Sequence, residues 1–178
     1  QSNHAMLTAA CAAKLGMSAI LVLKKRGVLS GGNLILDEIF GAEVRFVDTD
    51  SYDGVYAEME RIMADLRAQG HTPYFIPVGG SVPLGCLGYV NCAKEIANQA
   101  EDLGVDFDII VSATGSGGTY AGLTLGAKLF LPGTVSVGIG VCDDPFEAIS
   151  LDLMRETAAL LEADVPVEAA DIHIHYHI

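Results

Sequence analysis

The chain has little positive charge. Ten lysine and arginine residues stand against 23 aspartate and glutamate residues, so the formal net charge is −13. The basic residues are scattered along the chain and form no stripe. Because nucleic-acid affinity depends largely on such stripes, this balance argues against a nucleic-acid partner. An anionic small molecule stays possible, since cups of backbone amides act locally whatever the global charge.

Long apolar runs and paired cysteines are also missing. Apolar residues make up 51% of the 178 residues, which predicts a compact soluble chain of one domain or two small ones. No apolar run reaches the roughly 20 residues of a membrane-spanning helix, so we expect no membrane partner. The four cysteines form no Cys-x-x-Cys pair and have no zinc spacing, which is typical of reduced thiols in a cytoplasmic protein: Cys11, Cys86, Cys92 and Cys142.

The chain has no initiator methionine and no targeting segment. Its first residue, Gln1, directly precedes what looks like a functional segment, and its last eight residues, 171–178, end within an apparent strand. We therefore expect a fragment of a longer protein, truncated at both ends.

Strand and helix patterns alternate along almost the whole chain. Short apolar runs predict strands over 19–23, 43–47, 74–78, 108–113 and 134–141. Longer segments predict helices over 5–15, 33–40, 53–69, 87–103, 120–130 and 145–162. Strands alternating with helices indicate an α/β protein with doubly wound parallel sheets, in which ligands bind at the carboxyl ends of the strands. We expect a smaller domain over 1–73 and part of a larger one over 74–178.

Two of these helices have clear start signals. Ser2 or Asn3 is well placed to cap the first helix. The segment Asp144-Pro145-Phe146-Glu147 has the pattern of a capping box, with Asp144 at the N-cap and Glu147 three residues later.

The most informative segment is a glycine-rich loop between a strand and a helix. It is the run Thr114-Gly115-Ser116-Gly117-Gly118-Thr119. Such a turn directs several N–H groups into one concavity at the positive end of a helix dipole, which is typical of a phosphate site. A dinucleotide fingerprint from Gly115 would need its third glycine at Tyr120, and the Gly-Lys-Ser/Thr of a P-loop is absent. A nucleophile elbow centred on Ser116 would need glycine at Thr114.

Three histidines alternate with apolar residues near the end of the chain, at His173, His175 and His177. On a strand they would share one face, but residues two apart lie about 7 Å from each other, which is far for chelating one ion. We interpret this segment as a half-buried strand and predict no metal site.

Four segments together resemble one enzyme family, the D-cysteine desulfhydrase / 1-aminocyclopropane-1-carboxylate deaminase family. They occur in the family's order and cover essentially the whole chain: Gln1-Ser2-Asn3-His4-Ala5, Gly32-Asn33-Leu34-Ile35-Leu36-Asp37, Ile76-Pro77-Val78-Gly79-Gly80-Ser81 with Leu84-Gly85 and Leu87-Gly88-Tyr89, and Thr114-Gly115-Ser116-Gly117-Gly118-Thr119. The resemblance implies a pyridoxal 5′-phosphate enzyme of the tryptophan synthase β-like fold (fold type II).

The resemblance also implies roles for individual residues. Residues 114–119 (Thr114, Gly115, Ser116, Gly117, Gly118 and Thr119) would bind the cofactor phosphate. Asn3 would hydrogen-bond the phenolic oxygen of the cofactor. Ser2 and His4 would line the site of the substrate carboxylate, with Ser2 also a catalytic candidate for proton transfer. Ser81 would either contact the cofactor or cap its own turn.

The implied activity is that of a lyase on a small amino acid. The Gly-Ser-Gly-Gly-Thr form of the loop is similar to the desulfhydrase branch, which predicts β-elimination from D-cysteine to pyruvate, ammonia and sulfide. Deamination of 1-aminocyclopropane-1-carboxylate is the alternative, and Met6 stands where many members carry arginine. The family's Schiff-base lysine would precede Gln1, so a catalytically incomplete phosphate-binding module is a further alternative. Family members commonly form homodimers.

Overall fold

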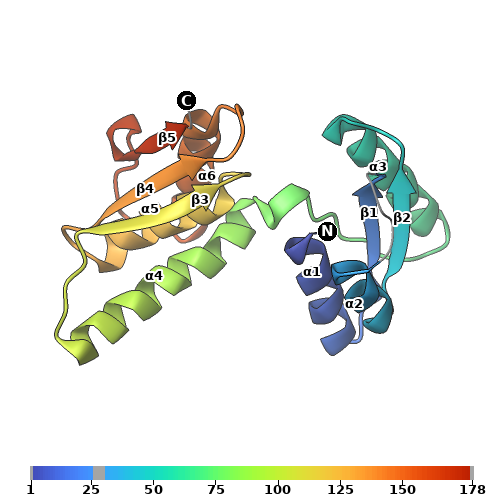
Figure 1. The fold of residues 1–178 in the computed structure, drawn as a ribbon, viewed down its shortest axis with the longest axis horizontal. Helices are drawn as coiled ribbons and strands as arrows, with labels where there is room; N and C mark the ends of the chain where they lie inside the picture. Colours follow the sequence, from blue (N-terminus) through green and yellow to red (C-terminus); the bar gives the residue numbers. More distant parts are fainter. Residues whose placement is uncertain (1, 26–30, 177–178) are drawn as a thin grey trace. The chain divides into compact units, whose positions relative to one another are not determined.

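The computed structural model describes residues 2–25 and 31–176. The chain divides into two compact units, Gln1–Ile76 and Pro77–Ile178. Figure 1 shows both, the first in blue to teal and the second in green to red. Each is described by itself.

The first unit holds a small parallel sheet with three helices. Its elements, in chain order, are α1 (Asn3–Lys14), β1 (Ile20–Lys24), α2 (Asn33–Ile39), β2 (Glu43–Val47) and α3 (Tyr52–Ala68). β1 pairs with β2 in parallel, with Leu21 opposite Val44. Leu21 packs with Ala5 and Ala9 of α1, because the short alanine side chains let this helix lie close to the sheet.

The second unit contains a three-stranded parallel sheet in the order β3-β4-β5. Its elements are η1 (Val78–Gly80), α4 (Pro83–Leu103), β3 (Ile109–Thr114), α5 (Gly118–Phe130), β4 (Val135–Gly140), α6 (Phe146–Leu160), η2 (Ala169–Asp171) and β5 (Ile174–Tyr176). Nine of the 13 residues of α5 are buried. The core lies where α5 packs on α4 and α6, around Leu125, Val90 and Met154.

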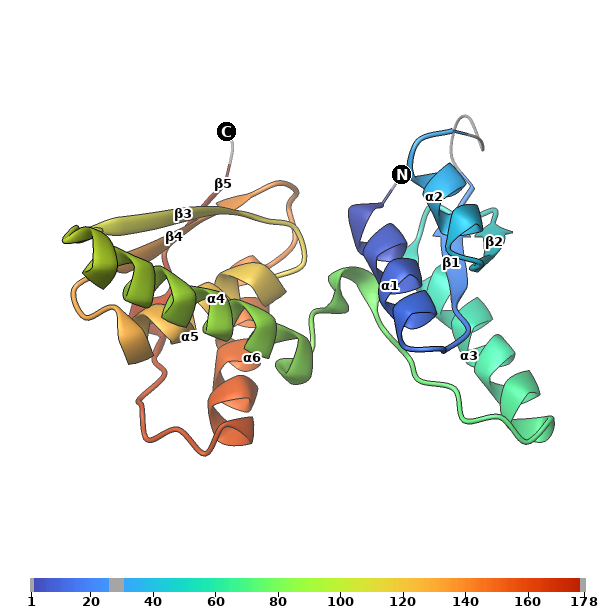
Figure 2. The ribbon, with the colours of Figure 1, turned by 90° about the horizontal axis from the view of Figure 1, so that it is seen from below.

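The three helices α4, α5 and α6 lie on the same side of this sheet (Figure 2). Its other face therefore carries exposed apolar side chains, of which Val111 is 64% exposed, with Ile109 and Val135 beside it. Successive side chains of a strand point to opposite faces, so Thr114 and Ser136 lie on the covered side and are buried.

Most predicted elements are present with ends shifted by a few residues, but the strand predicted over 74–78 is wrong. Residues 74–77 have no regular structure and Val78 begins η1. Tyr74 is 72% exposed. Proline at positions 73 and 77 explains the difference, because proline cannot donate to a strand ladder and keeps the preceding residue extended even where no strand forms.

The capping box predicted at Asp144 is also wrong. The N-cap of α6 is Pro145, whose side chain makes no cap hydrogen bond. The Asp144 carboxylate instead accepts the Cys142 thiol at 3.2 Å. The Tyr176 hydroxyl accepts the Phe146 N–H at 3.0 Å and donates to the Glu147 carboxylate at 2.5 Å. A tyrosine from β5 therefore satisfies the start of this helix in place of a local aspartate.

Candidate functional site

The glycine-rich loop joins the carboxyl end of β3 to the start of α5. β3 ends at Thr114 and α5 begins at Gly118. Its N-cap, Gly117, has no side chain, and the first amide of the helix, that of Gly118, is bound instead by the Ser81 hydroxyl from a distant segment. Because the first N–H groups of a helix have no partner within the helix, the amides that follow Gly118 are donors at the positive end of a helix dipole. This arrangement suits an anion.

Gly117 is required by both its backbone and its surroundings. Its φ of 84° lies in the left-handed region that L side chains rarely adopt. A Cβ at this position would lie 2.8 Å from Cγ2 of Ile149, a residue of α6 that packs behind the loop. The loop therefore packs closely against α6, and there is no room for a side chain at position 117.

The loop residues differ in what they expose. Thr114 is 1% exposed, and its Oγ1 has no hydrogen-bond partner within residues 2–25 and 31–176. It contributes to the loop through its main chain, whose carbonyl accepts the Val141 N–H at 3.1 Å. Gly115 is exposed, whereas Ser116 and Thr119 are half-buried. The hydroxyls accessible from solvent are therefore those of Ser116 and Thr119.

A second glycine-rich segment, residues 79–85, is in contact with the first. The Ser81 hydroxyl donates to Ser116 Oγ at 2.8 Å and accepts the Gly118 N–H at 3.2 Å. Sequence reasoning singled out Ser81 but not this contact. Both segments contain a serine beside glycines, and both precede a helix. No other signal in the sequence links residues 79–85 to residues 114–119.

The loop receives no positive side chain from its own unit. The three lysine and arginine residues of residues 77–178 lie elsewhere on the helices. Lys128, in the last turn of α5, pairs with Asp171; Lys94 lies over the ring of Phe130. Arg155 lies beside Asp152 on α6. An anion bound at this loop would be held by neutral amides and hydroxyls.

In the first unit, the predicted substrate segment begins α1. The Ser2 hydroxyl accepts the Ala5 N–H at 3.1 Å, which confirms the N-cap predicted at Ser2 or Asn3. Asn3 Oδ1 accepts from Asn33 Nδ2 at 2.7 Å. The His4 carbonyl accepts from the Thr8 hydroxyl. Asn33 is the first residue of α2, so two of the four segments in the resemblance are in direct contact.

This contact fixes how the Asn3 amide is presented. Because its oxygen is used by Asn33, the donor end of the exposed Asn3 side chain, Nδ2, is left to bind an acceptor. Ser2 is likewise exposed, and its hydroxyl proton is not used in the cap. Both side chains are thus fixed with a donor available.

Asp37 is a buried acid that sequence reasoning did not single out as functional. It lies one turn after Asn33 on α2, is 1% exposed, and its Oδ1 has no partner among the described residues. Desolvation by this burial raises the pKa of the Asp37 carboxyl. Only its place in the Gly-Asn-Leu-Ile-Leu-Asp segment could have drawn attention to it.

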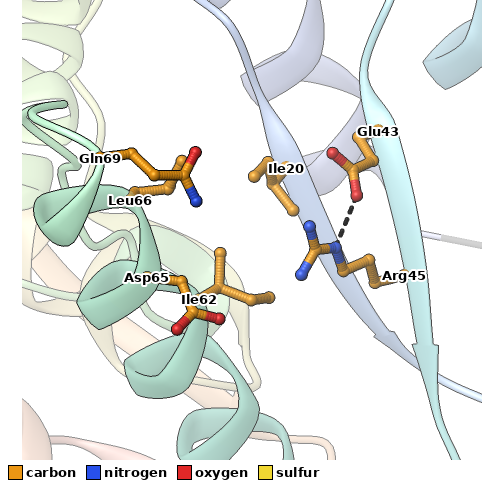
Figure 3. A pocket seen from close by; sticks show the side chains of 7 residues that line it. All are labelled: Ile20, Glu43, Arg45, Ile62, Asp65, Leu66 and Gln69. Carbon is orange, nitrogen blue, oxygen red and sulfur yellow. Dashed lines mark hydrogen bonds and ion pairs between the residues drawn. The ribbon is translucent and has the colours of Figure 1, made fainter.

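A hollow of about 240 Å³ lies elsewhere in the first unit (Figure 3). Arg45 Nε donates to Glu43 Oε1 at 2.6 Å on its wall, and Asp65 of α3 also lines it. Ile20 and Glu43 are the first residues of β1 and β2, so the hollow lies at the amino ends of the strands. Ligands of parallel sheets bind at the carboxyl ends, and we assign this hollow no function.

The histidine segment shows no metal site in the part of the chain that is described. His173 and His175 are exposed, and His177 lies outside the described residues. No group of three metal-ligating side chains occurs within residues 2–25 and 31–176. The His173 N–H donates to the buried Tyr120 hydroxyl at 2.7 Å, so this segment helps attach β5 to α5.

The parallel sheets, with helices between their strands, define an α/β protein that has a glycine-rich loop between β3 and α5. Residues 1–172 match the family model described as pyridoxal-phosphate dependent enzyme, and the chain belongs to this family. The fold class and the cofactor predicted from the sequence, pyridoxal 5′-phosphate, are thereby confirmed.

Relatives with both predicted activities are similar to the chain. A 1-aminocyclopropane-1-carboxylate deaminase of Mesorhizobium japonicum is 38% identical over 97% of this chain and 54% of its own length. A D-cysteine desulfhydrase of Serratia proteamaculans is 42% identical over 79% of this chain and 44% of its own length. A crystal structure of an ACC deaminase homologue has a TM-score of 0.87 at 41% identity and covers 98% of this chain and 52% of that one.

The chain spans about half the length of these relatives. Within the described ranges, no helix combines the length and apolar character needed to cross a membrane.

The residues present fit the phosphate of the family's cofactor. The N-cap of α5 is a glycine without a side chain, and the half-buried hydroxyls of Ser116 and Thr119 lie on either side of it in the loop. A phosphate monoester accepts hydrogen bonds, and this loop supplies amide and hydroxyl donors.

Proposed function

We propose that the protein is a pyridoxal-phosphate-dependent lyase that acts on a small amino acid, with D-cysteine as the substrate and pyruvate, ammonia and sulfide as the products. The observation that carries the proposal is the glycine-rich start of α5, where a neutral loop of amides and hydroxyls follows a strand of a parallel sheet. The similarity to a D-cysteine desulfhydrase supports the reaction.

In this proposal, the loop residues Thr114 to Thr119 hold the cofactor phosphate. Thr114 contributes its main chain only, because its side chain is buried. Ser116 and Thr119 contribute hydroxyls, and Gly117 and Gly118 shape the loop so that the phosphate can approach the backbone.

The Ser-Asn-His segment would bind the reacting end of the cofactor and substrate. Asn3 donates from Nδ2 to the phenolic oxygen, since Asn33 already uses its carbonyl oxygen. Ser2 and His4 bind the substrate carboxylate near the start of α1, where the helix dipole favours negative charge. The Ser2 hydroxyl accepts the Ala5 N–H and keeps its own proton free to transfer.

When bound, pyridoxal phosphate withdraws electrons from the α-carbon of the amino acid. The contribution of this chain is orientation: donors at a fixed phosphate site, a fixed amide at Asn3, and a hydroxyl at Ser2 positioned by its cap.

Deamination of 1-aminocyclopropane-1-carboxylate is the second candidate, supported by the similarity to a deaminase over 97% of this chain. The Gly-Ser-Gly-Gly-Thr form of the loop favours the desulfhydrase reaction. In solution we further propose a cytoplasmic homodimer, whose two domains correspond to residues 1–73 and 74–178. Four free cysteines are in keeping with the cytoplasmic location.

The test is to incubate the full chain and pyridoxal phosphate with D-cysteine, L-cysteine and 1-aminocyclopropane-1-carboxylate in separate reactions. We expect sulfide from D-cysteine and little ammonia from the cyclopropane amino acid. Ammonia from the latter alone would favour the deaminase. Tight cofactor binding without turnover of any of the three would identify a binding module.

A further inference from the structure

The two glycine-rich segments of the second unit meet in close contact. A Cβ on Gly118 would lie 2.7 Å from Ser81 Oγ and 3.2 Å from Ser81 Cβ. A Cβ on Gly79, whose φ is 70°, would collide with the Ser116 side chain. Neither segment can therefore change shape without moving the other, and the half-buried Ser81 side chain lies between them.

Ser81 accepts one hydrogen bond and donates another, so that the two bonds form a continuous chain. The Gly118 N–H, the first amide of α5, donates to Ser81 Oγ at 3.2 Å. Ser81 in turn donates to Ser116 Oγ at 2.8 Å. Hydrogen bonds in such a chain polarise one another, so accepting from Gly118 strengthens the donation from Ser81 to Ser116.

The direction of the Ser81–Ser116 hydrogen bond determines whether Ser116 presents its proton or a lone pair to a ligand. Because its oxygen accepts from Ser81, its own proton is left for another acceptor. Within residues 2–25 and 31–176, the one side-chain hydrogen bond of Ser116 is the one that it accepts from Ser81. A phosphate oxygen needs a donor, and the opposite orientation would present a lone pair to it.

We propose that Ser81 is a positioning residue for the cofactor phosphate: it links the first amide of α5 to Ser116 and so directs the Ser116 proton toward the phosphate. This inference rests on the proposed function, because it takes the loop to be the phosphate site. It adds a residue 35 positions away from Ser116 in the sequence to the determinants of phosphate affinity.

The test compares pyridoxal 5′-phosphate with pyridoxal, which lacks the phosphate. The dissociation constants of both are measured for the full chain by equilibrium dialysis, and their ratio reports the contribution of the phosphate. For Ser81→Ala we expect this ratio to fall about tenfold, as for the loss of one hydrogen bond to a charged group. The affinity for pyridoxal itself should not change.

A double-mutant cycle shows whether Ser81 acts through Ser116. In the Ser116→Ala background, Ser81→Ala should cause no further fall in the ratio. Ser136→Ala is the matched control, since Ser136 is a buried serine of the same unit that lies on β4, away from the loop. It should leave the ratio unchanged.

Two results would overturn the inference while the proposed function stands: an unchanged ratio in Ser81→Ala, or an equal loss of affinity for both ligands, which indicates a general structural role. If Ser81→Ala does not fold, Ser116→Ala tests the same link, and an unchanged ratio there also contradicts it. A wild-type protein that binds both ligands equally would instead refute the proposed phosphate site.

Discussion

The helices α1 and α5 begin in opposite ways. The start of α1 is capped by the Ser2 hydroxyl, and three of the 12 helix residues are buried. The start of α5 has a glycine N-cap, its first amide donates to Ser81 from a distant segment, and nine of its 13 residues are buried. A helix with little buried surface gains from a side-chain cap of its own, whereas a helix held by its core can begin at a glycine. The difference shows that the start of α5 is shaped by a residue from a distant segment and not by a side chain of its own N-cap.

Filling the space at Gly117 should have the largest effect. Gly117→Ala combines a left-handed backbone with a Cβ 2.8 Å from Ile149, so we expect a loss of about 2–5 kcal/mol in the free energy of unfolding. The affinity for pyridoxal phosphate should fall by more than about tenfold. Denaturant titration and equilibrium dialysis measure the two effects.

Gly133→Ala is the control for Gly117. Its φ of 94° is equally unfavourable for alanine, but a Cβ there would meet no atom within 4 Å. We expect a loss of about 1–2 kcal/mol in stability and unchanged cofactor affinity. Equal effects of the two substitutions on affinity would contradict the role of the loop.

Removing the cap of α1 should destabilise the protein less than Gly117→Ala does, but it should reduce turnover more. Ser2→Ala should lower the free energy of unfolding by about 1 kcal/mol, since the Ala5 N–H loses its acceptor. Ser2→Asp should restore most of that stability, because aspartate is also a good N-cap, but not turnover. Ser51→Ala, which removes the equivalent cap of α3, should lose similar stability and keep full activity. Turnover restored by Ser2→Asp would show that Ser2 only caps the helix.

The buried carboxyl of Asp37 should contribute to the pH dependence of the free energy of unfolding. Burial raises the pKa of Asp37 above its ordinary 3.8, so the folded state binds the proton more tightly than the unfolded state. Its contribution is therefore most favourable below about pH 3.8 and is lost as the pH rises through the folded-state pKa. Asp37→Asn should remove this component, so that the stability difference between variant and wild type shifts in favour of the variant as the pH rises.

Urea titrations between pH 3 and pH 7 measure this difference. Asp106→Asn, at an exposed position, serves as the control and should show no such trend. A difference between Asp37→Asn and wild type that stays constant over this range would contradict the raised pKa.

The smallest effect is expected within the loop itself, at Gly115. This residue is exposed, and a Cβ would lie 3.1 Å from Cγ2 of Val141, a contact that a small rotation relieves. We expect Gly115→Ala to change stability by less than about 1 kcal/mol and cofactor affinity by only a few-fold. A loss as large as that of Gly117→Ala would show that every loop glycine is needed.

Periodic segments were predictable because one helix face carries the apolar residues. The helix predicted over 53–69 is present as Tyr52–Ala68, with Val55 and Ile62 buried on one face. α4 begins at Pro83, earlier than the predicted 87, because proline is favoured in the first turn and the glycines at 85 and 88 do not end the helix.

The contacts between distant polar groups were not predictable. Ser81 and Ser116 meet because two irregular segments pack closely, and no spacing in the sequence encodes that contact. The Tyr176 hydroxyl replaces the predicted aspartate cap of α6 for the same reason. The loop was recognisable from its glycines, whereas the residues that hold it in place come from elsewhere in the fold.

The most direct test of the central claim is a crystal structure of the full chain with pyridoxal phosphate. We predict the phosphate within hydrogen-bonding distance of the loop amides at the start of α5 and of the Ser116 hydroxyl. A phosphate bound elsewhere, with the loop amides facing solvent, would contradict the account.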